Sequence, residues 1–210
     1  MGNQPLHYKI TDLKPGVRRP ERVTVFLDGK FAFSLDLTQV LEAKLKVGLE
    51  IDADRRAELE RASDFGKLYT RTLEWVLMRP RSIKETHEHL RLKRRQKSYS
   101  YTDEDIEIVI GRLTQKGYLN DQNFARWFVE NRNVKKGTSL RRLRQELSAK
   151  GIDGALIDEL LAETGRSDEA EIKKIIAKRA QKTTPEKLIA YLVRQGFPYD
   201  LSKSLVLETD

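Results

Sequence analysis

Three adjacent carboxylates, Asp103, Glu104 and Asp105, are the closest approach in this sequence to a catalytic or metal-binding cluster. General acid–base catalysis and divalent cations both use grouped carboxylates. These acids directly follow Thr102, however, and the Thr-x-x-Asp spacing is typical of the start of a helix. Because the helix dipole alone favours acids in the first turn, we interpret the cluster as helix-stabilising.

Other reactive groupings are also weak. The sequence has no cysteine, so disulfides and thiolate metal sites are excluded. His87 and His89 are two residues apart and would point away from each other on a helix. The segment "FGKLYT" lacks both the upstream glycine and the hydroxyl residue after lysine that a phosphate-binding loop requires. The sequence therefore predicts no enzyme, no metal site and no cofactor.

Lysine and arginine form three clusters whose chemistry suits a polyanion. Residues 79–97 hold eight Lys/Arg and two Glu, residues 132–150 seven and one, and residues 171–187 six and two. A formal net charge of +8 favours nucleic acid, a nucleoprotein or an acidic protein surface as partner. The candidate contact residues are Lys93, Arg94, Arg95, Lys135, Lys136, Arg141, Arg142, Arg144, Lys178, Arg179 and Lys182.

The clusters also allow a plainer interpretation. Arginine bonds phosphate and carboxylate equally well through its planar fork, so composition does not separate DNA from an acidic protein. Each cluster would also fit a solvated face that keeps the protein soluble. For residues 93–97 a disordered loop is a further alternative, because the segment contains no apolar anchor.

Arg141 and Arg144 are the most informative pair among these cations. They lie three positions apart on one flank of a predicted helix, without an acidic residue at i±4. Arg142, in contrast, has Glu146 at i+4 and can pair with it. Like-charged neighbours are unfavourable on a helix, so the first two arginines are predicted to be unpaired and available to a partner.

The elements that would carry these residues begin with a small β-rich unit. Two β-rich runs, Val23–Leu27 and Lys30–Leu35, flank Asp28-Gly29, which is a strong signal for a type I′ hairpin. The preceding "HYKITDL" supplies a third strand, and "LTQVLEAKL" is predicted to form a short helix on the sheet.

From Ala53 onward the apolar period changes from two to 3.6, which predicts helices to the end of the chain. Ser, Thr, Asp or Asn opens each run, as N-caps require. Gly117, Gly151 and Gly196 stand where left-handed residues end helices.

An internal repeat organises these helices. Residues 139–161 align with residues 184–206 after a shift of 45 positions, so that Leu143 matches Leu188 and Gly151 matches Gly196. A segment from Ser82 fits more loosely, and each of the three is preceded by a further helix, predicted at 66–78, 121–135 and 168–181. We therefore predict a mainly α protein of three tandem three-helix units, stacked into an elongated curved rod, after a small β-rich N-terminal unit.

The predicted boundaries follow from these elements. They are 1–52 for the β-rich unit, 53–117 for a linker helix with three-helix unit 1, 118–165 for unit 2 and 166–210 for unit 3. No apolar run approaches the ~18 residues of a membrane span, and the first residues lack the apolar region of a signal peptide. A cytoplasmic monomer without membrane contact is expected.

The segment "KGYLNDQNFARWFVENR", residues 116–132, is rich in aromatic residues but follows helical rules. Phe124, Trp127 and Phe128 lie on one flank at helical spacing, which favours core packing over base stacking. The predicted structural residues of this region, with an N-cap at its start, are Asn120, Asp121, Phe124, Ala125, Trp127 and Gly151.

Residues 66–206 resemble the RecX family of regulators of the RecA recombinase. The resemblance rests on "RLTQKGYLNDQNFARWFVENR" followed by "KGTSLRRLRQELSAKGID…LIDELL". The β-rich unit resembles an extension that some longer family members carry. The resemblance implies an all-helical modular protein that binds along the RecA–DNA filament and modulates it, usually by inhibition. DNA recombination, DNA repair and the SOS response are the processes that such a role implies.

A second class of function stays open from the residues alone. A three-helix unit could act as a helix-turn-helix reader that binds single- or double-stranded DNA directly. The predicted helix from Leu140 offers arginines and Gln145 without a clear base-reading Asn, so largely sequence-neutral contact with the phosphate backbone is expected in that case.

Overall fold

A computed structural model describes residues 7–17, 19–97 and 101–208 of the chain. It divides into two compact units. One comprises residues 1–75 with 90–111, and the other residues 76–89 with 112–210. Helices α3 and α4 contribute residues to both. Each unit is described by itself below.

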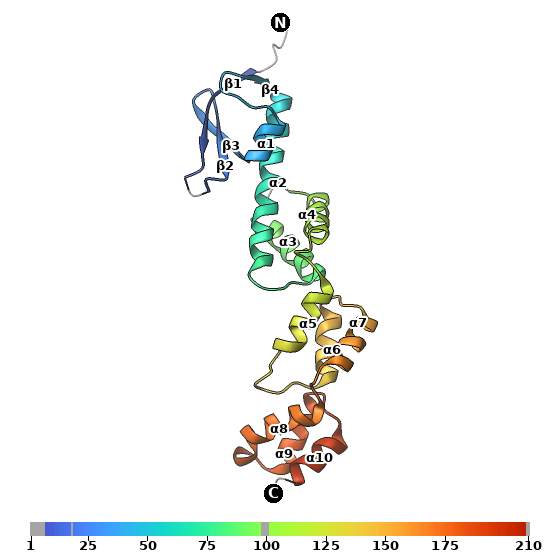
Figure 1. Cartoon of the computed structure of the whole chain (residues 1–210). Coiled ribbons are helices and arrows are strands. Elements are labelled where there is room, and N and C mark those ends of the chain that lie inside the picture. The colour runs from blue at the N-terminus through green and yellow to red at the C-terminus, as the bar shows by residue number, and fades with distance from the viewer. Residues whose placement is uncertain (1–6, 18, 98–100, 209–210) are drawn as a thin grey trace. The chain divides into compact units, whose positions relative to one another are not determined.

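The first unit begins with a four-stranded antiparallel sheet in the order β3-β2-β1-β4 (Figure 1). The strands are β1 (His7–Pro15), β2 (Arg22–Leu27), β3 (Lys30–Asp36) and β4 (Glu50–Asp52). The predicted hairpin is confirmed, since Leu27 pairs with Lys30 and both Asp28 and Gly29 have positive φ, at 50° and 78°. Strand β4 was not predicted, because a strand of three residues is too short to give a periodic signal.

One face of the sheet forms an apolar core with the helices beside it. Ile10, Val25 and Leu35 are completely buried there. Helix α1 (Leu37–Glu42) follows β3 directly, and a capping box between Asp36 and Gln39 fixes its start, with hydrogen bonds of 2.8 and 2.9 Å. This is the short helix that the sequence predicts.

Helix α2 (Ala53–Leu77) is a single helix of 25 residues, so the predicted linker helix and the first helix of the first repeat are continuous. Hydrogen bonds join its N-terminal half to the sheet side of the unit. The Gln39 side-chain amide donates to the Ala62 carbonyl at 2.8 Å, and the Ser63 hydroxyl donates to the Ser34 carbonyl at 2.7 Å. The β-rich segment and α2 therefore form one body in this unit.

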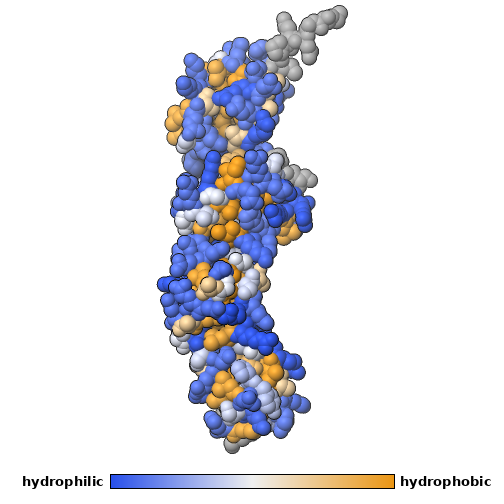
Figure 2. All heavy atoms as spheres, turned by 90° about the vertical axis from the view of Figure 1, so that its right-hand side faces the viewer, coloured by the Kyte–Doolittle hydropathy of each residue, from blue (hydrophilic) through white to orange (hydrophobic). Residues whose placement is uncertain are grey.

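The remaining helices complete a mainly α fold, as predicted. They are α3 (Ile83–Lys97), α4 (Asp103–Gln115), α5 (Asp121–Asn131), α6 (Leu140–Ala149), α7 (Gly154–Glu163), α8 (Asp168–Arg179), the 3-10 helix η1 (Ala180–Lys182), α9 (Pro185–Arg194) and α10 (Tyr199–Leu207). Hydrophilic residues dominate the face shown in Figure 2, and apolar residues appear there in small separate groups.

The internal repeat is visible in the cores of the second unit. Helices α5, α6 and α7 enclose one core, and α8, α9 and α10 enclose another. Leu143 and its counterpart Leu188 are buried, with 0% and 2% exposure. Gly151 and Gly196 both have positive φ after α6 and α9, at 83° and 91°. The repeat therefore preserves both the apolar positions and the helix ends.

Two side-chain caps connect neighbouring repeats within this unit. The Ile83 N–H, at the start of α3, donates to Asp121 Oδ1 at 2.9 Å. The Leu140 N–H, at the start of α6, donates to Asp168 Oδ1 at 2.8 Å in the same way. The corresponding residue of α9 is Pro185, which has no N–H to satisfy.

Helix α5 ends four residues before the predicted position. Arg132 leaves the helical conformation, with ψ 110°, and Asn133 takes a left-handed conformation with φ 50°. The turn places the Arg132 guanidinium against Glu146 of α6, at 2.6 and 2.9 Å. A contact with another helix thus overrides the helical period at this point.

Candidate functional site

The candidate contact residues of the first cationic cluster, Lys93, Arg94 and Arg95, lie at the end of α3, so the disordered-loop interpretation of residues 93–97 is wrong. Arg94 pairs with Asp103 at 2.8 Å, and Arg91 lies 3.8 Å from the same carboxylate. The hydrogen bond from Arg94 lowers the pKa of Asp103. Lys93 is half-buried and Arg95 is exposed. The first turn of α4 therefore offsets part of this cluster.

The second cluster is partly neutralised by Glu146. Arg142 pairs with this carboxylate at 3.2 Å, as its i+4 spacing predicts. Arg132 pairs with it as well, and hydrogen bonds from Arg132 and then Arg142 lower the pKa of Glu146. Arg142 also donates to Gln195, the C-cap residue that follows α9. It therefore joins two repeats and is not a free cation.

The prediction for Arg144 is wrong in one respect. Arg144 is exposed, but its guanidinium pairs with Asp158 of α7. The acid is on a packed neighbouring helix, which a search at i±4 along α6 does not reach. Arg141 is exposed, and among the described residues no carboxylate lies within ion-pair distance of it. Of the two arginines only Arg141 keeps an unpaired guanidinium.

The turn between α5 and α6 carries Lys135 and Lys136, both exposed. The Lys178 ammonium of α8 donates to the Lys135 carbonyl. The turn and the third cluster are therefore in contact within this unit.

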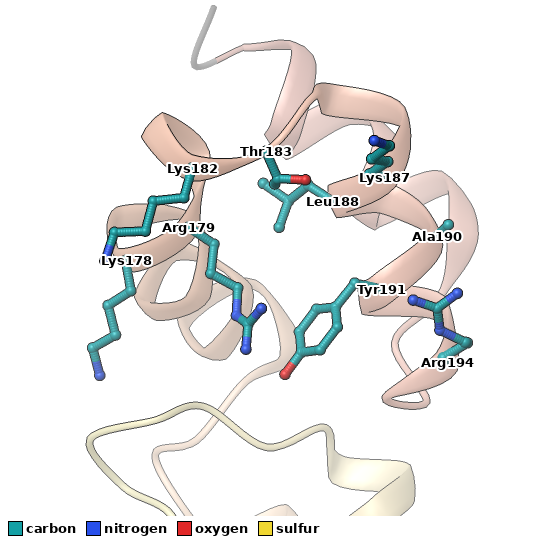
Figure 3. A pocket seen from close by; sticks show the side chains of 9 residues that line it. All are labelled: Lys178, Arg179, Lys182, Thr183, Lys187, Leu188, Ala190, Tyr191 and Arg194. Carbon is teal, nitrogen blue, oxygen red and sulfur yellow. The ribbon is translucent and has the colours of Figure 1, made fainter.

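The third cluster borders a cavity of about 720 Å³ between the end of α8, η1 and α9 (Figure 3). Five cations line it, namely Lys178, Arg179, Lys182, Lys187 and Arg194, together with Thr183, Leu188, Ala190 and Tyr191. The Arg179 guanidinium lies over the Tyr191 ring, 4.2 Å from its centroid, and Figure 3 shows the two side chains pointing toward each other. Among the described residues no acidic side chain lines this cavity.

Three residues of the cavity lining were not among the predicted contact residues, namely Lys187, Tyr191 and Arg194. Their spacing of i, i+4 and i+7 along α9 places them on one helix face, whereas Leu188 and Leu192 of the same helix are buried in the core. That spacing is the signal that could have identified them.

A second cavity of about 510 Å³ lies between α6 and the end of α9, with Arg141, Gln145 and Arg194 in its lining. Arg194 borders both cavities, so it connects the two surfaces. We call the surface of Arg141, Arg179, Lys182, Lys187 and Arg194 the cationic strip. Within the described part of the chain none of these five cations has a carboxylate partner.

Four of the residues predicted to be structural lie at the start of α5 or in and beside its core. Asn120 caps α5, accepting a hydrogen bond of 2.9 Å from the Asn123 N–H. Phe124 and Ala125 are buried in the core of α5–α7, with 1% and 0% exposure. Trp127 is half-buried beside them, with Arg79 5.4 Å from its ring centroid.

The described residues contain no group of three or more His, Cys, Asp or Glu placed to hold a metal ion. None of the helices they form is long and apolar enough to cross a membrane.

Comparison with known proteins assigns the family. Residues 8–52 match the family model of the regulatory protein RecX N-terminal domain, and residues 120–161 match that of the second three-helix domain of RecX. The regulatory protein RecX of Bacillus licheniformis is 32% identical over 209 residues, which cover 96% of this chain and 77% of the relative. The chain belongs to the RecX family. RecX of Bacillus subtilis is also 32% identical, over 200 residues covering 91% and 74% of the two chains.

Solved RecX structures share the fold. A crystal structure of regulatory protein RecX aligns with a TM-score of 0.67 at 24% identity, covering 92% of this chain and 96% of that one. RecX from Lactobacillus salivarius aligns with a TM-score of 0.52 at 23% identity, covering 70% and 97%. The names of the RecX relatives describe regulatory proteins. The predicted resemblance is thus confirmed, and it extends to the β-rich segment.

Proposed function

We propose that the chain binds the RecA–DNA filament and mainly inhibits its recombinase, ATPase and coprotease activities by occupying the filament groove. Membership of the RecX family supports a regulatory role. The observation that carries the proposal is the cationic strip, in which two repeats present cations without carboxylate partners. A monomer acting in the cytoplasm, in DNA repair, recombination and the SOS response, belongs to the same proposal.

The physical basis is charge complementarity spread over many sites. A nucleoprotein filament combines DNA phosphates with protein surface, and an unpaired cation gains more from such a partner than a paired one does. Contacts on tandem repeats act at high effective concentration once the first is made, so no single contact has to be strong. A chain in the groove would then exclude a second DNA strand or a cleavable substrate.

The test compares charge reversal on and off the strip. We expect the double variant Arg141→Glu with Arg194→Glu to be a weaker inhibitor of RecA strand exchange and ATPase on single-stranded DNA. The protein concentration needed for half-maximal inhibition should rise at least tenfold. The matched control is Lys173→Glu with Lys203→Glu, which changes the net charge equally at exposed positions outside the strip. If both double variants inhibited as well as the parent chain, the strip would not be the contact surface.

A direct, sequence-neutral DNA-binding role is the second candidate. It is favoured by the two cavities on the strip, because their described lining residues include cations and no acid other than Glu146, which is paired. Binding to bare DNA and to RecA-coated DNA across a salt series separates the two roles. A sequence-specific footprint on bare duplex would contradict both.

A further inference from the structure

The larger cavity of the strip combines three features on one side of the third repeat. Lys182 and Lys187 are exposed cations on opposite sides of it, contributed by η1 and α9 (Figure 3). Arg194 extends the charge toward the second repeat, since it also borders the neighbouring cavity. Ala190 and the half-buried Tyr191 ring give an apolar wall between these charges. Along α9 the lining therefore changes from charged at Lys187 to apolar at Ala190 and Tyr191, and back to charged at Arg194.

Arg179 is held ready for an anion. Its guanidinium lies over the Tyr191 ring at 4.2 Å, a cation–π geometry that restricts the side chain without neutralising it. Less conformational entropy is then lost when an anion binds. Among the described residues no acidic side chain lines the cavity, and Glu186, the nearest acid in sequence on α9, is outside its lining.

We propose that this cavity seats the phosphate backbone of a single-stranded nucleic acid, which continues past Arg194 toward Arg141. Arg179, Lys182, Lys187 and Arg194 contact the phosphates, and an unstacked base packs against Ala190 and the part of the Tyr191 ring that Arg179 does not cover. The inference rests on the proposed function in one respect: it takes the cationic strip as a contact surface and names the partner of one part of it.

A single strand fits better than a duplex for a geometric reason. In a duplex the flat faces of the bases are stacked on one another, so the apolar wall of the cavity would have nothing to contact. A single strand is flexible, exposes base faces and follows a concave surface. Aromatic side chains beside cations are the usual composition of such sites.

An acidic protein segment fits less well. The strip runs over two repeats with no unpaired carboxylate among its described lining residues, so a peptide partner would have to be acidic along its whole length. A nucleic-acid strand has that uniform charge at every residue.

The experiment measures binding of the whole chain, without RecA, to a fluorescein-labelled oligothymidylate of about 20 nucleotides, roughly one to five site lengths. Fluorescence anisotropy is followed across a salt series. Lys187→Ala with Arg194→Ala should weaken binding and reduce the slope of log K against log salt by about 1.4, since each lost phosphate contact removes about 0.7. Lys173→Ala with Lys203→Ala removes the same charge from outside the strip and should leave the slope unchanged.

Two competitors identify the partner class. An unlabelled single strand should displace the probe at lower concentration than a duplex of equal length or polyglutamate of equal charge. An unchanged slope in the Lys187/Arg194 variant, or stronger competition by duplex or polyglutamate, would overturn the proposal. Because RecA is absent, such a failure leaves the filament assays as an independent test of the proposed function.

Discussion

Glu171 is a fully buried carboxylate, with 0% exposure, between the second and third repeats. Arg166 meets it with two hydrogen bonds of 3.0 and 3.1 Å, Lys174 with one of 2.8 Å, and the Thr138 N–H with one of 2.9 Å. Arg166 in turn donates to the Val129 carbonyl at 2.7 Å. Burial by itself raises the pKa of Glu171, but the bonds from Lys174, Arg166 and Thr138 outweigh it and lower the pKa.

The Glu171→Gln variant is predicted to lose about 3 kcal/mol of unfolding free energy at pH 7, because it leaves Arg166 without its counter-charge. A lowered pKa in the folded state means that the ionised carboxylate stabilises the fold above the unfolded pKa of about 4.5. This contribution is lost as the pH falls through the folded pKa. Urea unfolding from pH 7 to pH 3 should therefore show the difference between variant and parent narrowing below pH 4.5.

Glu169→Gln is the matched control for this prediction. Glu169 also pairs with a lysine, Lys173 at 2.5 Å, but both side chains are exposed. Its loss should cost less than about 0.5 kcal/mol. Equal losses of unfolding free energy for Glu169→Gln and Glu171→Gln would show that burial does not determine how strongly the Glu171 network stabilises the fold.

The charged residues show where sequence reasoning stops at this scale. The pair Arg142–Glu146 was predictable, because helix geometry alone brings i and i+4 together. The pair Arg144–Asp158 was not, because it depends on how α7 packs on α6. The same limit applies to Arg179, whose partner Tyr191 belongs to another helix.

At the scale of elements, the turn before α6 depends on Gly137. Its φ is 85°, and a Cβ atom there would lie 2.7 Å from the Glu171 carbonyl oxygen and 2.8 Å from Ile175 Cγ1. Gly117 also has positive φ, at 75°, but a Cβ atom there would meet nothing within 4 Å. Substituting each of the two glycines by alanine therefore separates the cost of the left-handed backbone from the cost of a steric clash.

We predict that Gly117→Ala costs about 1 kcal/mol, from the left-handed backbone alone. Gly137→Ala should cost at least about 3 kcal/mol, because backbone and a branched side chain must also move. Thermal and urea unfolding measure both. Losses of the same size would mean that the turn relaxes freely around the added methyl group.

The caps between repeats give a second prediction for elements. Asp168→Ala removes the acceptor for the Leu140 N–H and should cost about 1 kcal/mol. Asp168→Asn keeps an oxygen at the same position and should retain most of that stability. Urea midpoints of the two variants measure the difference, and an equally large loss in both would assign the effect to charge instead of capping.

Local signals explain why most elements were predictable. Asp28-Gly29, the capping boxes and Gly151 act through nearest neighbours, so the hairpin and most helix ends follow from the sequence. The end of α5 does not, because Arg132 leaves the helix to reach Glu146 fourteen residues away. The lining of the larger cavity likewise comes from α8, η1 and α9, whose approach to one another no local pattern encodes.

At the scale of the whole molecule, the cations that pack against acids and those that remain unpaired are interleaved along the chain. The sequence shows three clusters of similar composition, but pairing with Asp103, Glu146 and Asp158 offsets parts of the first two. The five unpaired cations of the cationic strip lie on the second and third repeats. Net charge therefore predicts the class of partner, while the pattern of ion pairs decides which repeats would meet it.

If both repeats contact one filament at the same time, their contributions to binding are coupled only through that filament. Arg141→Ala lies on the second repeat and Lys187→Ala on the third, and neither has a carboxylate partner among the described residues. Each change should weaken binding to RecA-coated DNA by several-fold, and the double variant should show the product of the two effects, within about 0.5 kcal/mol. Titrating labelled filaments with the parent chain, the two single variants and the double variant measures these effects. If Lys187→Ala had no effect alone or in combination, the third repeat would lie outside the filament contact, and binding would depend on the second repeat and the segments before it.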